Sequence, residues 1–414
     1  MATQQTLLAI NAGSSSVKVS VFGYSRGDED PKPLADIEIS GLTAPPARLT
    51  YSRGNKHVDG QEVNHVRSQS DAWAAILDQL MADDGLPLQK VDDIVFACHR
   101  VVHGGGNDRP VRIVGTTLRQ LEALSELAPL HNAGALEIVK EVQAKCPNTA
   151  NVACFDNAFH STMPLETRTY AIDPAVAKRN ELRRYGFHGL SYSFITRAVA
   201  RYLSKSHAEV NLIALHLGSG ASACCIRQGM SMDTSMGLTP LSGLPGATRS
   251  GSVDPSLIFH FTNNAGNLAP GSTKEMHITQ AEQILNKESG WKVLTGTTDF
   301  GSISTRAEKG DEKCKLAFDL MVDRICGFVG AYFVKLEGKV DALVFAGGIG
   351  EHGASLRKAV VQKVACLGFG IDNESPELKA VVTELGPKTL ICKTDEQAEM
   401  ARECMRDAER LLGD

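Results

Sequence analysis

The sequence predicts an α/β protein built from two similar halves, and three observations lead to this fold class. Short apolar runs typical of strands alternate with helical patterns along the 414 residues. Two kinds of segment recur in the same order in the first and second halves. Several strand-like runs lead directly into glycine-rich turns. A chain of this length has room for two or more domains.

The hydrophobic pattern sets the expected elements in order. Strands are expected at the short apolar runs of residues 7–10, 17–22, 94–98, 152–155, 212–217, 222–227, 343–346 and 389–392. Helices are expected where apolar residues recur at helical spacing, in residues 70–81, 117–126, 133–145, 191–204, 254–263, 279–286, 311–337, 354–366 and 395–412. Thr394 to Gln397 has the pattern of a capping box, which predicts the start of the last helix.

Internal similarity gives the domain organisation. Leu7–Ser16 resembles Leu212–Ala221, and both segments predict a β-hairpin with a glycine turn. Val91–Ala97 is echoed by Val340–Ala346, and each copy leads into a glycine-rich loop. One such pair alone could arise by chance. Two pairs in the same order predict a duplicated α/β domain with a ligand between the halves.

Composition narrows the classes of function. The net charge is −5 and no run of five basic residues occurs, so the sequence carries no footprint for nucleic acid or an anionic membrane. The ten cysteines lack zinc spacing, and Cys224 and Cys225 lie in an apolar run, where buried thiols are expected. With no basic leader and no apolar stretch of membrane length, the expected compartment is the cytoplasm.

The glycine loops suggest a phosphate ligand. The sequence has no P-loop motif, but Gly348–Gly353 follows a strand, precedes a helix and has Asp372 beyond it, as in a dinucleotide-binding fingerprint. A dinucleotide site would leave the loops Gly13–Ser16 and Gly218–Gly220 unexplained. Several such loops more naturally form backbone N–H nests around one polyphosphate, so we favour a nucleoside triphosphate over NAD.

Three cations are candidates to bind that phosphate. Lys18 lies on the strand that leaves the first glycine loop, although a strand lysine is often a solvated surface residue. Arg100 and Arg249 lie in segments of small residues, and a guanidinium binds phosphate or carboxylate with two hydrogen bonds. The alternative for each arginine is an ion pair at the surface. The glycines around Arg249, Gly246 and Gly251, favour close approach of a ligand.

Three further polar residues have two interpretations each. His188 lies in an aromatic and glycine-rich segment before a helix, where it could act on substrate or simply pack. Asp156 follows a buried strand, as a turn former or as an active-site acid at the carboxyl edge of the sheet. Glu396 lies in the first turn of the last helix, where it would stabilise the helix dipole or bind Mg²⁺.

Together these residues resemble the acetate kinase family of the actin, sugar-kinase and Hsp70 superfamily. The resemblance rests on ordered motifs at residues 10–18, 99–105, 155–160, 184–189, 216–220, 233–237 and 248–251. It implies duplicated actin-like (ribonuclease H-like) domains with an interdomain nucleotide cleft. The expected limits are 1–155 with a C-terminal helix at about 393–414, and 156–392. It also implies a homodimer and the Mg²⁺-dependent, or Mn²⁺-dependent, reaction of ATP with acetate to give ADP and acetyl phosphate.

The resemblance also implies residue roles. The catalytic group would be Arg100, Asp156, His188 and Arg249. The substrate would contact Arg100, Val102, Leu130, Phe187 and Pro240. ATP would contact Lys18, His216, Leu217, Gly218, Ser219, Gly220, Asp299, Phe300, Gly301, Gly348, Ile349, Gly350, Glu351 and His352. The metal would be held by Asn11 and Glu396.

The chemistry can be derived from the charges involved. Acetate is ionised at neutral pH, so it needs no general base, and catalysis requires in-line positioning and charge neutralisation. We therefore expect Asp156 to organise Mg²⁺ and its waters. The chain departs from the family pattern at Ser219, before Arg249, at Gly301 and at His352. Because of these departures, pyrophosphate or another phosphoryl donor in place of ATP stays open. The alternative functions are a propionate or butyrate kinase and a non-catalytic actin-like nucleotide-binding protein.

Overall fold

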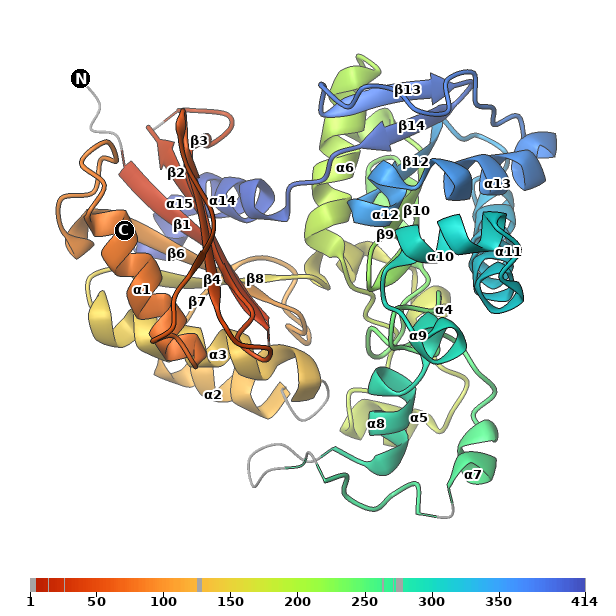
Figure 1. Ribbon diagram of the computed structural model, residues 1–414, viewed down its shortest axis with the longest axis horizontal. Helices are drawn as coiled ribbons and strands as arrows, with labels where there is room; N and C mark the ends of the chain where they lie inside the picture. The colour runs from red at the N-terminus through yellow and green to blue at the C-terminus, as the bar shows by residue number, and fades with distance from the viewer. Residues whose placement is uncertain are drawn as a thin grey trace. The chain divides into compact units, whose positions relative to one another are not determined.

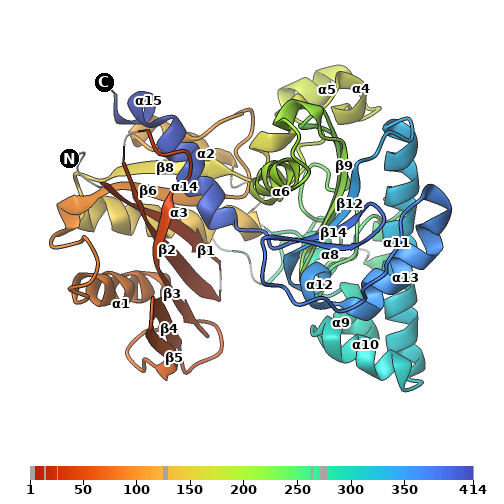
Figure 2. The ribbon, with the colours of Figure 1, turned by 90° about the horizontal axis from the view of Figure 1, so that it is seen from above.

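The computed structural model describes residues 5–13, 15–25, 27–124, 129–262, 264–270, 272 and 278–413, without the side chains of 129–133. The chain divides into two compact units (Figures 1 and 2). Unit 1 is Met1–Ala158 with Asp395–Asp414, and unit 2 is Phe159–Thr394. The sequence analysis set these limits at 155/156 and near 393. The last segment of the chain thus belongs to the same unit as the first.

Unit 1 is built on a mixed sheet with the strand order β5-β4-β3-β2-β1-β6-β8-β7. Its strands are β1 (Gln5–Ala12), β2 (Ser16–Tyr24), β3 (Lys32–Ser40), β4 (Arg48–Arg53), β5 (Lys56–Glu62), β6 (Ile94–Val101), β7 (Val111–Arg112) and β8 (Ala150–Phe155). The predicted hairpin is confirmed, since β1 and β2 pair antiparallel. Strands β1, β6 and β8 are parallel, so their carboxyl ends lie at the same edge of the sheet.

Unit 2 repeats this arrangement in a sheet with the order β11-β10-β9-β12-β14-β13. Its strands are β9 (Leu212–Leu217), β10 (Ala221–Arg227), β11 (Met230–Thr234), β12 (Ala342–Ala346), β13 (Val382–Gly386) and β14 (Thr389–Cys392). Strands β9 and β10 form the second predicted hairpin, β9, β12 and β14 are parallel, and an antiparallel strand closes the edge as β7 does in unit 1. The predicted duplication is therefore confirmed, with β4 and β5 as additions to unit 1.

Helices cover both faces of the sheet in unit 1. They are α1 (Gln69–Met81), α2 (Gly115–Leu124), α3 (Pro129–Lys145), α14 (Glu396–Arg406) and α15 (Ala408–Leu412). Leu8 and Ile10 point to the face where α1 and α3 complete the core. The alternate residues face α14, where Gln397 donates to the Ala9 carbonyl at 3.1 Å. The strand alternation therefore fixes α14 on the face that also carries Cys98 and Arg100.

The helices of unit 2 surround the second sheet. They are α4 (Leu165–Arg168), α5 (Pro174–Arg179), α6 (Gly189–Tyr202), α7 (Leu257–Phe261), α8 (Gln280–Lys287), α9 (Gly290–Thr295), α10 (Phe300–Glu308), α11 (Glu312–Lys335), α12 (Gly347–His352) and α13 (Ala354–Val364). The long helix α11 buries Met321, Ile325 and Val329 in the core beneath β9 and β10. No helix in the described parts of the chain is long and apolar enough to cross a membrane.

Two local expectations are wrong. The segment after β12 is the short helix α12 rather than a glycine loop, because its packing against β9 and β12 overrides the low helix propensity of glycine. The capping box at Thr394 does not form either. Asp395 is the N-cap residue and accepts from the Ala398 N–H at 2.8 Å, whereas the Thr394 hydroxyl contacts Ser191 Oγ.

Candidate active site

An ionic cluster lies at the carboxyl edge of the sheet in unit 1. Arg100 is near the end of β6, Asp156 follows β8, and Glu396 is the first residue of α14. Arg100 donates from Nε and Nη2 to the two oxygens of Asp156 at 3.0 and 2.7 Å, and its Nη1 lies 3.0 Å from Glu396 Oε2. One guanidinium thus holds two carboxylates from separate elements.

The charges in this cluster depend on one another. The Asp156 side chain is 1% exposed, so its charge requires a buried partner. Burial by itself would lower the pKa of Arg100, but the charges of Asp156 and Glu396 raise it, so Arg100 stays a cation. Burial raises the pKa of Glu396, and the charge of Arg100 opposes that rise. The cluster is therefore a fixed cation set between two acids.

The β1–β2 hairpin brings two more predicted residues to this edge. Asn11 and Lys18 are directly opposite each other across the hairpin. The charge of Lys18, like that of Arg100, opposes the rise that burial causes in the pKa of Glu396. Val102 is half-buried just beyond β6. The side chain of Leu130 lies outside the described residues.

The donor atoms in unit 1 can be tested against a divalent metal. In the described part of the chain, no group of three acidic, histidine or cysteine side chains is arranged to hold a metal ion. Asp156 and Glu396 supply two carboxylates that contact different nitrogens of Arg100. Mg²⁺ usually takes one or two protein carboxylates and completes its shell with water and phosphate oxygens. The residues fit such an ion and do not form an all-protein cage.

Two histidines lie side by side in unit 2. The rings of His188 and His216 have centroids 4.2 Å apart. His188 is the N-cap of α6 and has a left-handed backbone with φ 61°, while His216 is on β9. Each ring is held through Nδ1 by a serine hydroxyl: His188 by Ser222 at 2.9 Å and His216 by Ser191 at 2.8 Å.

The loop that carries Arg249 packs on the glycine turn between β9 and β10. The Ala247 N–H donates to the Ser219 carbonyl at 2.8 Å, and a Cβ on Gly220 would lie 2.9 Å from Arg249 Nη1. The structure shows a packing role for the glycines beside Arg249. A Cβ on Gly246 would collide with the Ser219 carbonyl, and one on Gly251 with the backbone near Leu244. They permit loop packing, and the expected ligand approach is not needed to explain them.

The remaining predicted residues also lie in unit 2. Pro240 is buried and its carbonyl lies 3.5 Å from Arg249 Nη1, and Phe187 is buried just before His188. Asp299 caps α10 by accepting from the exposed Gly301. The side chain of Phe300 packs in the core against Trp291. On α12, Gly348 and His352 are exposed, Ile349 and Glu351 are half-buried, and Gly350 packs near Leu217.

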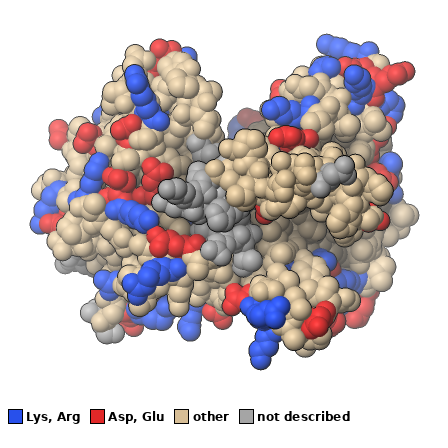
Figure 3. Space-filling view, turned by 90° about the horizontal axis from the view of Figure 1, so that it is seen from below, with Lys and Arg blue, Asp and Glu red and all other residues tan. Residues whose placement is uncertain are grey.

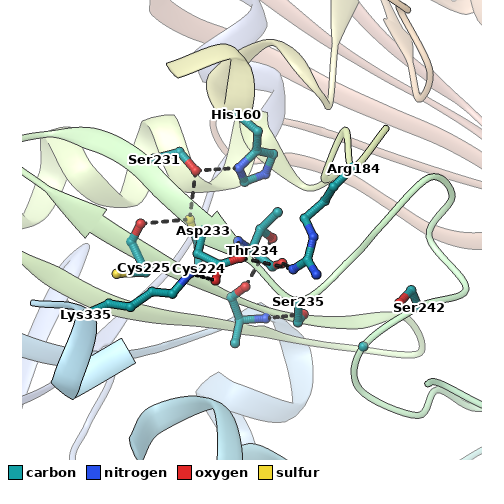
Figure 4. A network of polar contacts seen from close by, with 12 residues as sticks. His160, Arg184, Cys224, Cys225, Ser231, Asp233, Thr234, Ser235, Ser242 and Lys335 are labelled. Carbon is teal, nitrogen blue, oxygen red and sulfur yellow. Dashed lines mark hydrogen bonds and ion pairs between the residues drawn. The ribbon is translucent and has the colours of Figure 1, made fainter. Parts of the chain in front are cut away.

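Sequence reasoning missed the network that holds the loop before His188 (Figure 4). Asp233 pairs with Lys335 and accepts from Arg184 at 3.0 Å, and Arg184 also donates to the Thr234 carbonyl. His160 lies 2.8 Å from Ser231 Oγ (Figure 4). Its Nε2 lies 3.0 Å from the Phe187 carbonyl. His160, Arg184 and Asp233 all stand in the ordered motifs noted above. Membership of those motifs was the only indication of their importance.

The surface shows no comparable organisation on the face drawn in Figure 3. Acidic and basic side chains are intermixed there. All ten cysteines are free, and Cys224 and Cys225 are buried as expected, with burial raising the pKa of each thiol. The concentration of buried charge and hydrogen-bonded histidine at the two sheets therefore marks the candidate site.

Comparisons with known proteins identify the family. Residues 6–406 match the acetokinase family. The probable acetate kinase of Chaetomium globosum is 51% identical over 97% of this chain and 98% of its own length, and the acetate kinase of Streptomyces coelicolor is 37% identical over 95% of each chain. Two solved structures are similar. A propionate kinase from Francisella tularensis has a TM-score of 0.82 at 32% identity, covering 96% of this chain and 98% of that one. The acetate kinase of Porphyromonas gingivalis has a TM-score of 0.81 at 30% identity, covering 97% and 99%. The chain belongs to the acetokinase family.

Proposed function

We propose that this protein is an acetate kinase that transfers the terminal phosphoryl group of ATP to acetate, reversibly, giving acetyl phosphate and ADP. The observation that carries the proposal is the fixed Arg100 cation between Asp156 and Glu396, in a chain that belongs to the acetokinase family. The curated relatives cited above are named acetate kinases, which favours acetate over the other acids considered.

In this proposal Arg100 binds the carboxylate of acetate. The charges of two acids keep Arg100 a cation, and acetate would replace one of its carboxylate contacts as a hydrogen-bond acceptor. The methyl group would contact Val102, Leu130, Phe187 and Pro240. Acetate is already a nucleophile at neutral pH, so no residue has to remove a proton from it.

The phosphoryl group requires positive charge and hydrogen-bond donors as it moves. We assign His188 and Arg249 to its equatorial oxygens, because phosphoryl transfer depends chiefly on positioning and charge stabilisation. Lys18 and His216–Gly220 would contact the ATP phosphates. The segments Asp299–Gly301 and Gly348–His352 would contact the nucleoside.

We also propose that Mg²⁺, or Mn²⁺ in its place, is required. Asn11, Glu396 and Asp156 would hold the ion and its waters, and the bound ion would neutralise charge on the phosphates. Two carboxylates around the same guanidinium support this assignment. A chelator should abolish turnover, and added Mg²⁺ should restore it.

Assembly and location are proposed on the family resemblance. We propose a cytoplasmic homodimer. In unit 2, the large apolar side chains of Phe259, Phe261 and Leu268 are 75%, 53% and 56% exposed, which supports their burial by a partner. Sedimentation at several concentrations would test it: a mass near twice the chain supports the dimer, and a monomer at all concentrations contradicts it.

The function is tested by initial rates on purified protein with acetate, propionate and butyrate, each with ATP or with pyrophosphate. The expected result is the highest kcat/KM for acetate with ATP. A preference for propionate would shift the acyl specificity towards that of the solved propionate kinase named above. Turnover with pyrophosphate alone would overturn the donor. ATP binding without phosphotransfer would favour the non-catalytic alternative.

A further inference from the structure

A chain of three side chains ends on His188. Ser222 lies on β10 and is fully buried, and its Oγ is 2.9 Å from His188 Nδ1. The phenol oxygen of Tyr192, one turn into the helix that His188 begins, is 2.5 Å from the same Oγ. Tyr192 is also fully buried. Ser222 was described above only as a contact of His188, and Tyr192 was not part of that site.

The direction of the protons follows from the partners of Tyr192. The phenol oxygen of Tyr192 and Nδ1 of His188 both lie within hydrogen-bond distance of Ser222 Oγ. The phenol has its own proton, and a buried hydroxyl proton needs an acceptor, which Ser222 Oγ provides. Ser222 then has one proton left, and His188 Nδ1 accepts it. If Ser222 donated to the phenol oxygen instead, the buried phenol proton would need a different acceptor.

Burial keeps this direction stable. It raises the pKa of Tyr192 well above that of a free phenol, so Tyr192 keeps its proton at neutral pH. The ring is fixed as well, since His160 packs edge-on against it at 5.7 Å between centroids. His160 also donates to the Phe187 carbonyl and so anchors the backbone next to His188.

We propose that Ser222, oriented by Tyr192, is a positioning residue that fixes His188 as the neutral tautomer with its proton on Nε2. This inference rests on the proposed function for its consequence. A neutral imidazole with a proton on Nε2 can donate a hydrogen bond to a phosphoryl oxygen from that atom, whereas the other tautomer can only accept there. The Tyr192–Ser222–His188 chain would therefore decide whether His188 can stabilise the transferred group.

The tautomer can be measured without any assay of activity. Protein labelled with ¹⁵N in histidine gives different shifts for the two ring nitrogens in long-range ¹H–¹⁵N spectra, and the spectrum of His188→Asn identifies the His188 signals. In the wild type we expect neutral His188 to carry its proton on Nε2. Ser222→Ala should give a mixture of tautomers. A wild-type signal with the proton on Nδ1 would overturn the proposal, whether or not the protein is an acetate kinase.

Kinetics measure the consequence. Ser222→Ala should lower kcat by roughly 10–100-fold, the range found when a second residue that orients a functional histidine is removed, with little change in the KM for acetate. Tyr192→Phe should show a smaller loss, and Ser222→Thr, which keeps the hydroxyl, should retain most of the activity. Thr196→Val is the matched control, because it removes a buried hydroxyl of α6 that donates to the Tyr192 carbonyl and does not reach His188.

Each outcome is decisive. A normal kcat in Ser222→Ala, or a loss in Thr196→Val as large as in Ser222→Ala, would overturn the positioning role. If Ser222→Ala does not fold, Tyr192→Phe and the wild-type spectrum still test it, because Tyr192→Phe keeps the buried ring and removes only the proton donor. An inactive wild type with His188 protonated on Nε2 would contradict the proposed function and leave the tautomer assignment intact.

Discussion

The two units hold their functional side chains in different ways. In unit 1, Arg100, Asp156 and Glu396 are held by charge, and each would be costly to bury without the others. In unit 2, His188 and His216 are held by neutral hydroxyls from Ser222 and Ser191. The two copies of the fold therefore fix their functional side chains differently, one by ion pairs and the other by neutral hydrogen bonds. Removing an ionic partner should damage stability and activity together, whereas removing a neutral partner should cost less stability for a comparable loss of activity.

The largest effect is expected for Arg100→Ala. It leaves the Asp156 and Glu396 carboxylates together without a cation, which should lower the free energy of unfolding by about 3–5 kcal/mol. Loss of the charge should also lower kcat by roughly 10²-fold or more. Urea unfolding and initial rates measure the two effects. Arg48→Ala, which breaks the exposed pair with Glu62, is the control and should change neither.

Arg249→Ala should lower kcat without lowering the free energy of unfolding. Arg249 is half-buried on its loop, with Nη1 near the Pro240 carbonyl. Its loss should lower kcat by roughly 10²-fold through lost charge stabilisation, while the urea midpoint stays close to that of the wild type. A loss of stability as large as that of Arg100→Ala would erase the proposed difference between the units.

A smaller effect concerns His99, which is buried beside Arg100. Burial lowers the pKa of His99 from 6.5 to about 4. Between these values the unfolded chain binds a proton that the folded protein does not, so stability is fully present above pH 6.5 and declines towards pH 4. The free energy of unfolding should fall by about 3 kcal/mol over this range. Urea unfolding over this range should show a shallower decline for His99→Gln. The exposed His57→Gln should behave as wild type.

The smallest effect is expected for Gly220→Ala. The new Cβ would lie 2.9 Å from Arg249 Nη1, the mobile end of a long side chain, and Gly220 does not have a positive φ. The protein should therefore stay as stable as wild type, and displacement of Arg249 should cost less kcat than Arg249→Ala does. In the Arg249→Ala background the glycine substitution should be nearly silent. Full additivity of the two losses would show that Gly220 acts independently of Arg249.

The sequence was sufficient where a strong pattern coincided with burial. Every expected strand lies within an observed one, because each is an apolar run in the interior of a sheet. The sequence analysis did not anticipate β5, Lys56–Glu62, since none of its residues is buried and no apolar pattern marks it. The helix α12 was missed for the opposite reason, because its glycines suggest a loop and only its packing makes it a helix.

The candidate site could be predicted only in part, for a similar reason. Arg100, Asp156 and His188 lie at strand ends and in glycine-rich motifs, which the sequence displays. Ser222 lies inside an apolar strand, and Tyr192 on a buried helix face, so each looks like part of the core. Their relation to His188 exists only through the pairing of β9 with β10 and the placement of α6. The roles assigned to the site residues themselves stay predictions until the variants above are assayed.

The return of the chain to unit 1 has a consequence for synthesis. Unit 1 is interrupted by the whole of unit 2 and is completed by α14, which carries Glu396 and the hydrogen bond from Gln397 to β1. At about 5–20 residues per second, the first part must wait on the ribosome for roughly ten to fifty seconds while unit 2 is made. The carboxylate that completes the ionic cluster is therefore among the last side chains to be translated. A nascent chain interrupted before α14 would lack Glu396, so this topology limits the complete site to chains translated through that helix.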